Sequence, residues 1–440
     1  MNHTVRHLVR NMRSRDARGT GRGAGLRTMR QMNRLLVLNC MREEGPLARV
    51  KIADRTGLSR TTVGSIINSL LREGLAREGS LLDAAPAGGR RATLVHFNAD
   101  AGNVLGVDIG RTHFTVVASN LAASIEARHS GPFDADLGPS TCLPQLVAEL
   151  RAFVERNHLS WDRMVGIGVG IPGPMDTGLS RLISPPRMPG WHGTDIRQIL
   201  RRELGVPVYL DNDANMGALG ESRFGAGRGV YEMAYIKVGT GIGGGLVING
   251  NIYRGSRGSA GELGHVTIDS DGRLCDCGNR GCLEVTAGAA AIVQNACTGG
   301  YRSGAGDSAR PGVREMDVAE VVSAALAGDA ACRAAVRRAG EDIGVALAGL
   351  VNLVNPSLIL IAGGVSHAGE LLLGPIRQAI TTRSLPAASS HTEVRVAELG
   401  DNAIALGAVA TVIDAAFSGP SSAAGVIPEP VGTGPPVPQA

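Results

Sequence analysis

Hydrophobic positions in residues 31–98 first repeat with helical spacing and then shorten into strand-like runs. The spacing predicts a first helix over Asn33–Arg42 and a second helix that Pro46 and Leu47 open and that runs through Thr56. Ser59 is a suitable N-cap for a third helix. The apolar stripe of that third helix consists of Val63, Ile66, Ile67, Leu70 and Leu71. Three short helices in this order favour a small helical domain.

The opposite face of the third helix is polar, and two strand-like runs follow it. The face carries Arg60, Thr61, Thr62, Ser65, Asn68 and Ser69. Short donors and acceptors near the start of a helix suit base edges and phosphates in a major groove. Leu75–Glu78 and Ala92–Phe97 flank a tip with Arg90 and Arg91, which suits a wing that contacts DNA. We therefore predict a winged helix-turn-helix over residues 31–98; a helical adaptor that never touches DNA is the alternative.

From Val104 to about Val412, strand-like apolar runs alternate with amphipathic helical segments. This alternation is typical of an α/β protein. The segment 418–440 is rich in Pro, Gly, Ser and Ala without periodicity, and we predict a disordered tail there. Residues 1–30 are predicted as a disordered basic arm.

The charge distribution sharpens the difference between the two regions. Residues 1–100 contain 18 Arg and Lys against 8 Asp and Glu, whereas residues 101–440 contain 26 against 32. A basic first quarter on an acidic body is typical of a nucleic-acid binder, although a solvated basic arm gives the same balance.

Other features concern the compartment. No run of about 18 uncharged apolar residues occurs, which argues against a membrane span. The basic first 30 residues lack the apolar segment of a secretory signal. Of seven Cys, three lie within eight positions, which favours a metal site in a reducing cytoplasm over a disulfide framework.

The metal motif is the most specific local signal in the chain. His265 precedes three closely spaced thiols, and the four predicted ligands are His265, Cys275, Cys277 and Cys282. One imidazole and three thiolates are the soft ligands that tetrahedral structural Zn²⁺ prefers. Because four protein ligands close the coordination sphere, the sequence predicts a structural ion and not a hydrolytic one.

Polar and glycine-rich turns follow several predicted strands, and strand ends of α/β sheets are where ligands bind. Asn212 and Asp213 form a polar cluster after Val208–Leu210. Turns whose backbone can approach a phosphate supply the candidate nucleotide-binding residues, with Asp108 helping to hold a metal ion. These candidates are Asp108, Gly110, Thr112, Gly239, Thr240, Gly241, Gly363 and Gly364.

These motifs, in this order, resemble the ROK family of repressors, open reading frames and sugar kinases, in its branch with an N-terminal helix-turn-helix. The resemblance covers roughly residues 31–412 and rests on D-x-G-x-T, N-D-A-N, G-T-G-x-G-G-G and E-x-G-H…C-x-C-G-x-x-G-C-x-E. It implies a two-lobed, actin-like (ribonuclease H-like) sugar-kinase fold with sugar in the interlobe cleft. Residues 104–211, completed by about 400–416, would form the small lobe, and residues 212–399 the large lobe with the zinc site.

By the matching motifs, the resemblance implies five sugar-binding side chains: Asn212, Asp213, Glu262, His265 and Glu284. His265 would use one ring nitrogen for zinc and offer the other to sugar. The implied partners are double-stranded operator DNA, a small sugar or sugar derivative, and further copies of this chain, since family members commonly form dimers or tetramers.

The resemblance also raises the question of catalysis. In kinases of the family, the aspartate matching Asp213 is the general base, with ATP and Mg²⁺ as cofactors. Those kinases usually have a small residue where this chain has Arg111, whose guanidinium would occupy or block the phosphate pocket. The sequence thus favours a sugar-responsive regulator, a repressor of carbohydrate uptake or catabolism genes. An ATP-dependent sugar kinase with a retained DNA-binding arm stays open, as does a regulator controlled by a sugar-transport protein.

Overall fold

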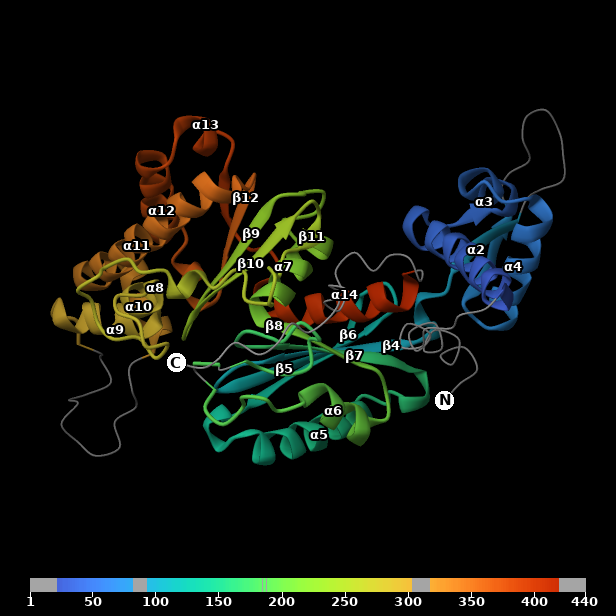
Figure 1. The fold of residues 1–440 in the computed structure, drawn as a ribbon, viewed down its shortest axis with the longest axis horizontal. Coiled ribbons are helices and arrows are strands. Elements are labelled where there is room, and N and C mark those ends of the chain that lie inside the picture. The colour runs from blue at the N-terminus through green and yellow to red at the C-terminus, as the bar shows by residue number, and fades with distance from the viewer. Residues whose placement is uncertain (1–21, 82–92, 184, 187, 303–316, 419–440) are drawn as a thin grey trace, which may run out of the picture.

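The computed structural model describes residues 22–81, 93–183, 185–186, 188–302 and 317–418 of the 440-residue chain. Three sheets organise these residues, one of three strands and two of five. Figure 1 shows the N-terminal elements as a separate group beside two larger α/β halves, with the long helix α14 (Ala403–Phe417) between them. The fold is therefore the predicted one: a winged helix-turn-helix followed by a two-lobed α/β body.

The described residues of the N-terminal module form three helices and a small antiparallel sheet with strand order β1-β3-β2. Its elements are α2 (Arg22–Glu44), β1 (Leu47–Ala48), α3 (Arg49–Thr56), α4 (Arg60–Arg72), β2 (Ala76–Leu81) and β3 (Thr93–Phe97). Helix α4 begins at the predicted cap, where the Ser59 hydroxyl accepts a hydrogen bond from the backbone N–H of Thr62 at 3.1 Å. Gly57 adopts the left-handed conformation (φ +68°) that ends α3 and turns the chain towards α4.

Two predicted boundaries in this module are wrong. Helix α2 already begins at Arg22, so residues 22–30 are helical and do not belong to a disordered arm. The second helix begins at Arg49 and not at Pro46, because Leu47 and Ala48 pair with Val95 and Leu94 of β3. Local propensity carries no information on that distant partner strand.

The first five-stranded sheet has the order β6-β5-β4-β7-β8, with the first three strands antiparallel and the last three parallel. Its elements are β4 (Asn103–Ile109), β5 (His113–Asn120), β6 (Ile125–Pro132), α5 (Pro139–Arg156), β7 (Met164–Ile171), α6 (Ile196–Leu204) and β8 (Val208–Asn212), with short 3-10 turns η1 (Ala99–Ala101), η2 (Ala135–Leu137) and η3 (Trp161–Arg163). Helices α5 and α6 cover one face and α14 covers the other (Figure 1).

The second five-stranded sheet repeats this arrangement in the order β11-β10-β9-β12-β13. Its strands are β9 (Met233–Val238), β10 (Ile242–Ile248), β11 (Asn251–Ile252), β12 (Leu358–Ala362) and β13 (Glu393–Val396). The helices are α7 (Asp213–Phe224), α8 (Leu283–Ala287), α9 (Ala289–Thr298), α10 (Val318–Ala327), α11 (Ala330–Val354), α12 (Glu370–Arg383) and α13 (Pro386–Ser389), with 3-10 turns η4 (Leu263–His265), η5 (Gly364–Ala368) and η6 (Gly400–Asn402). The repetition gives the two lobes that the motifs predict.

Helix α14 joins the regions of the molecule. It packs on β4 and β7 and against α7, and glycines let the backbones approach closely. A Cβ at Gly168 of β7 would lie 2.0 Å from the Ala408 carbonyl oxygen, and one at Gly407 would lie 1.7 Å from that of Met216. At its other end, the ring of Phe417 contacts Phe97 of the winged module with centroids 5.6 Å apart.

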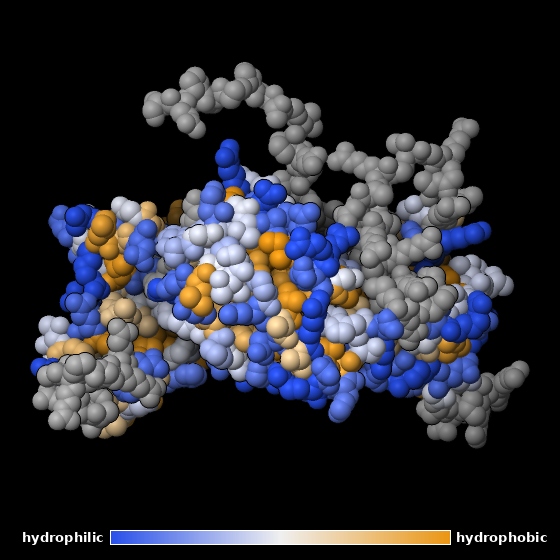
Figure 2. All heavy atoms as spheres, turned by 90° about the horizontal axis from the view of Figure 1, so that it is seen from below, coloured by the Kyte–Doolittle hydropathy of each residue, from blue (hydrophilic) through white to orange (hydrophobic). Residues whose placement is uncertain are grey.

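Helix α14 with its preceding turn is also the one segment of the described residues that is long and apolar enough to cross a membrane. The segment Gly400–Phe417 is, however, 72% buried inside the protein, as expected for a core helix. Figure 2 shows the face that α5 and α6 cover, where hydrophobic residues are interspersed among hydrophilic ones.

Candidate functional site

The four predicted metal ligands come together. Their ligand atoms, from His265, Cys275, Cys277 and Cys282, all lie within 4.8 Å of one another. Nδ1 of His265 lies 3.7 Å from Sγ of Cys275, and Sγ of Cys277 lies 3.6 Å from that of Cys282. Burial raises the pKa of the Cys282 thiol to about 12, and a bound divalent cation opposes that shift because it favours the thiolate. The group is a candidate metal centre.

Tight turns hold the thiols in place. Gly278 (φ +90°) follows Cys277, and its N–H donates to the carbonyl of Cys275 at 2.9 Å. Gly281 (φ +61°) precedes Cys282, and a Cβ there would lie 1.5 Å from the Asp269 carbonyl oxygen. Glycine is therefore required at this position by both conformation and space.

The ring of His265 faces two ways. Its Nδ1 points at the thiols, whereas Nε2 lies 4.0 Å from Oε2 of Glu262. Burial, assisted by the charges of Asp213 and Glu284, raises the pKa of the Glu262 carboxyl to about 7. Three of the predicted sugar-binding carboxylates are thus near enough to influence one another, and the metal centre adjoins them.

Glu284 and Asn212 form hydrogen bonds that hold the backbone near these carboxylates in place. Oε2 of the buried Glu284 accepts from the N–H of Ile242 at 3.0 Å, which ties the carboxylate to the start of β10. Asn212 is the N-cap of α7: its Oδ1 accepts from the N–H groups of Ala214 and Asn215, and its Nδ2 donates to the Gly173 carbonyl at 3.1 Å. Within the described part of the chain, Nδ2 donates this one hydrogen bond, so its second N–H is left for a further acceptor.

An ion pair between Asp211 and Arg254 lies beside this cap and was not predicted from the sequence. Oδ2 of the buried Asp211 accepts from Nε of Arg254 at 2.8 Å and from its terminal nitrogen at 2.6 Å. Oδ1 of Asp211 accepts from the N–H of Asn212 and from Nδ2 of Asn215. The bidentate pair positions the start of α7. The Arg254 partner, distant in sequence, gave no signal beyond its charge.

Asp213, the predicted sugar-binding residue and conditional general base, is 8% exposed and has two partners. Its Oδ1 accepts from the N–H of Ala214, and its Oδ2 accepts from Nζ of Lys237 on β9 at 2.9 Å. Lys237 also interacts electrostatically with Asp108 at the end of β4. Lys237 is one of two lysines in the chain, and that rarity was the one sequence signal that could have found it.

The candidate nucleotide-binding turns surround the same point. Oδ1 of Asp108, a residue 5% exposed, has no hydrogen-bond donor among the described residues. The N–H of Gly110 donates to the carbonyl of His113 and closes the turn that precedes β5 and contains Thr112. Gly239, Thr240 and Gly241 form the β9–β10 turn, and Gly363 with Gly364 follows β12, where a Cβ at Gly363 would lie 2.4 Å from the Val238 carbonyl oxygen.

Arg111, which the sequence suggested would occupy or block the phosphate pocket, pairs with a carboxylate of its own lobe. Its guanidinium donates to Oδ2 of Asp136 at 2.9 Å, and both side chains are more than a third exposed. The hydrogen bond to Asp136 raises the pKa of Arg111. The cation that faces Asp213 is Lys237, which lies on β9 of the same lobe.

The predicted DNA-binding face of α4 lies open. Arg60, Thr61, Ser65 and Asn68 are exposed and Thr62 is partly exposed. The opposite face buries Val63, Ile67 and Leu70 in the module core. The predicted wing residues Arg90 and Arg91 lie outside the described residues.

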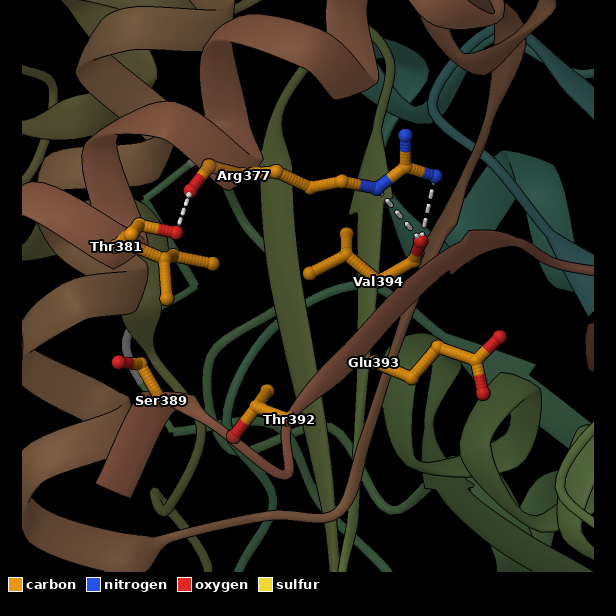
Figure 3. Close-up of a pocket in the computed structure, with 7 residues that line it drawn as sticks. Arg377, Thr381, Ser389, Thr392, Glu393 and Val394 are labelled. Atoms are coloured by element: carbon orange, nitrogen blue, oxygen red, sulfur yellow. Dashed lines mark hydrogen bonds between the residues drawn. The ribbon is translucent and has the colours of Figure 1, made fainter. Parts of the chain in front are cut away.

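A further hollow of about 230 Å³ lies between α12, α13 and β13 (Figure 3). Arg377 lines this hollow, and its guanidinium already donates to the Val394 carbonyl and to Glu370. None of its lining residues belongs to the predicted site, so we assign it a structural role.

Comparison with known proteins agrees with this geometry. The model of the ROK family matches residues 104–415, and a model described as winged helix-turn-helix DNA-binding matches residues 33–77. The chain is similar to the xylose repressor of Caldicellulosiruptor bescii, at 32% identity over 397 residues that cover 90% of this chain and 98% of the relative. It is 38% identical to the glucokinase of Halalkalibacterium halodurans over 310 residues, 69% of this chain and 92% of that one.

A solved structure described as a ROK family transcriptional regulator, a homologue of the E. coli MLC protein, matches with a TM-score of 0.73 and 26% identity. The match covers 89% of this chain and 97% of that structure. The similarity to regulators therefore extends through the N-terminal module.

Proposed function

Because this chain belongs to the ROK family and carries a winged helix-turn-helix ahead of its ROK domain, we propose that it is a sugar-responsive repressor of genes for carbohydrate uptake or catabolism. The observation that carries this proposal is the open polar face of α4 on the same chain as the interlobe carboxylate cluster. The alignment with a xylose repressor over 98% of that relative supports it.

The proposed ligand is a neutral sugar in the interlobe cleft. Asn212, Asp213, Glu262, His265 and Glu284 offer the carboxylates, amide and imidazole that bind neighbouring hydroxyls. We assign a structural Zn²⁺ to the centre made by His265 and the three cysteines, since one imidazole and three thiolates are its preferred donors. The ion would fix the ring of His265 and, through it, the neighbourhood of Glu262.

Helix α14 supplies a physical connection between sugar and DNA. Helix α7 starts at Asp213 in the cleft and packs along α14, whose last residue, Phe417, contacts the winged module. The guanidinium of Arg42 lies 5.0 Å from the Phe417 ring centroid, and Nδ2 of Asn39 donates to its carbonyl at 3.0 Å. A sugar that binds the closed arrangement of the lobes more tightly would shift the equilibrium towards it, and this contact would change with it. The free energy of that shift can be no larger than the difference in the sugar's affinity for the two forms.

In this proposal the repressor acts in the cytoplasm as a dimer or tetramer, which presents two recognition helices to paired half-sites. The test combines a thermal-shift screen of aldohexoses and aldopentoses with fluorescence anisotropy on DNA from upstream of its own gene. A sugar that raises the melting temperature by binding the native state should also change the affinity for DNA. Release of DNA by a cell extract and by no sugar would replace the sugar with a protein partner, such as a transport component.

A further inference from the structure

Lys237 places an ammonium group directly beside the general-base candidate Asp213. Transfer of a phosphoryl group to a sugar needs a carboxylate that is free to accept the hydroxyl proton and a divalent cation on the phosphates. Here Oδ2 of Asp213 already accepts from Nζ of Lys237 at 2.9 Å, and Oδ1 accepts from the N–H of Ala214 at 2.9 Å. Both oxygens of the general-base candidate are therefore engaged.

The charge of the ammonium also acts on a second carboxylate, that of Asp108. Burial opposes the charge of Lys237, but the carboxylates of Asp213 and Asp108 outweigh it and raise its pKa above the ordinary value. The side chain is 26% exposed, extends from β9 of the large lobe, and meets the end of β4 of the small lobe electrostatically. Asp108 is 5% exposed, and its Oδ1 has no donor among the described residues. Burial raises the pKa of this carboxyl above its ordinary value, although the charge of Lys237 opposes the shift.

Magnesium-ATP therefore does not fit this centre. A divalent cation would need the Asp213 oxygen that already accepts from Lys237, and its charge would repel the ammonium. We propose that Lys237 is a built-in cation that takes the place of the metal between Asp108 and Asp213, so that the cleft binds sugar but does not phosphorylate it. This inference rests on the proposed function, because it assumes that the cleft binds a sugar.

The experiment removes the ammonium of Lys237 and measures whether the protein then binds a divalent cation with ATP and phosphorylates sugar. Lys237→Thr removes the charge with a residue suited to a strand, and Lys237→Met removes it at nearly constant length. Lys51→Met, at the other lysine of the chain and on the exposed surface of α3, is the matched control. Mn²⁺ binding in the presence of ATP is measured by electron paramagnetic resonance, together with ATP-dependent phosphorylation of an aldohexose and aldopentose panel.

We expect wild type and Lys51→Met to show no ATP-dependent Mn²⁺ binding, and both Lys237 variants to gain it at least tenfold in affinity. In Lys237→Thr we expect slow transfer: a sugar hydroxyl oxygen bonds to the γ-phosphorus of ATP, the bond to ADP breaks, and the proton passes to Asp213. The additional substitution Asp213→Asn should abolish transfer and weaken the regained Mn²⁺ binding, because it removes a carboxylate that serves both.

Two results would overturn the inference. One is turnover by the wild type at ordinary kinase rates of about 1–100 per second. The other is a folded Lys237→Thr and Lys237→Met pair, verified by circular dichroism melting, that still binds sugar but gains neither Mn²⁺ nor transfer. Failure of the proposed function is a separate result, since the wild type would then ignore every sugar or fail to bind its upstream DNA.

Discussion

The recognition helix and the interlobe cleft present their polar side chains differently. On α4, Arg60, Ser65 and Asn68 extend into solvent. In the cleft, Asp213 and Glu284 are buried, and each already accepts a hydrogen bond from the protein. A surface that binds a polyanion gains most of its affinity from phosphate contacts, so its donors can stay hydrated until DNA arrives. A site for a small neutral ligand must hold its groups in position beforehand.

This difference predicts that a substitution in the cleft leaves the DNA-binding face of α4 intact, and the reverse, unless the substituted residue contacts α14. The winged module shares its apolar core with α14 and the inner small-lobe strands β4, β5 and β7, whereas the candidate metal centre packs within the large lobe. Substitutions can therefore be chosen that affect the cleft, the connection, or the DNA face separately.

The largest effect is expected at the metal centre. Cys282→Ser removes one of four ligands and should lower the free energy of unfolding by more than about 5 kcal/mol, because binding of a structural ion contributes directly to folding. The variant should contain no zinc by atomic absorption and give no sugar-induced thermal shift, while DNA binding persists. Cys142→Ser is the control, since Cys142 is equally buried but lies in the small lobe outside the ligand group. Full metal content in Cys282→Ser would contradict the assignment.

The next effect concerns the connection itself. Phe417→Ala removes the ring contact with Phe97 and the guanidinium of Arg42, and should destabilise the protein by about 3 kcal/mol. Sugar binding should persist, whereas the sugar-induced change in DNA affinity should fall at least tenfold. Phe153→Ala, which empties the small-lobe core beneath α5, should cost similar stability but keep the response. Equal responses in the two variants would rule out α14 as the connection.

How much of the structure could be predicted from the sequence depends on how far apart in the chain the contacting residues lie. The His/Cys group and the α4 cap could be predicted because the residues that meet lie within about 20 positions of each other: His265 with Cys282, and Ser59 with Thr62. Strand β1 was missed because its partner, Val95, lies 48 residues away and no local preference encodes the pairing. The paired lobes followed from the resemblance and were confirmed by the repeated strand order.

The cleft contains a cation that the sequence analysis did not predict. The sequence pointed to Arg111 as the residue that would block phosphate, and its guanidinium binds Asp136, whereas the cation beside Asp213 is Lys237. Lys237 lies beside Asp213 because β9 and α7 of the same lobe pack together, and its charge also acts on Asp108 at the end of β4 of the other lobe. Such a contact depends on how α7 packs on β9, which motif spacing along the chain does not determine.

On the DNA face, Arg60→Ala and Asn68→Ala should each weaken operator binding by about tenfold to a hundredfold, the usual cost of one lost base or phosphate contact. If Arg60 contacts phosphate, its variant should also reduce the slope of log affinity against log salt by about one. Sugar-induced thermal shifts should remain unchanged in both. Arg201→Ala, an exposed arginine in the last turn of α6, controls for the loss of one positive charge. Wild-type operator affinity in both α4 variants would exclude this helix as the reading element.

The smallest effect separates folding from recognition within a single helix. Ser59 caps α4 through the N–H of Thr62, so Ser59→Ala should lower the free energy of unfolding by about 1 kcal/mol. Ser65, one turn further on, is exposed, so Ser65→Ala should leave stability within about 0.5 kcal/mol and act on DNA affinity instead. Chemical denaturation and anisotropy titrations on the two variants should therefore give opposite rankings. The same ranking in both measurements would mean that the polar face of α4 serves the fold, and that the contrast with the cleft does not hold.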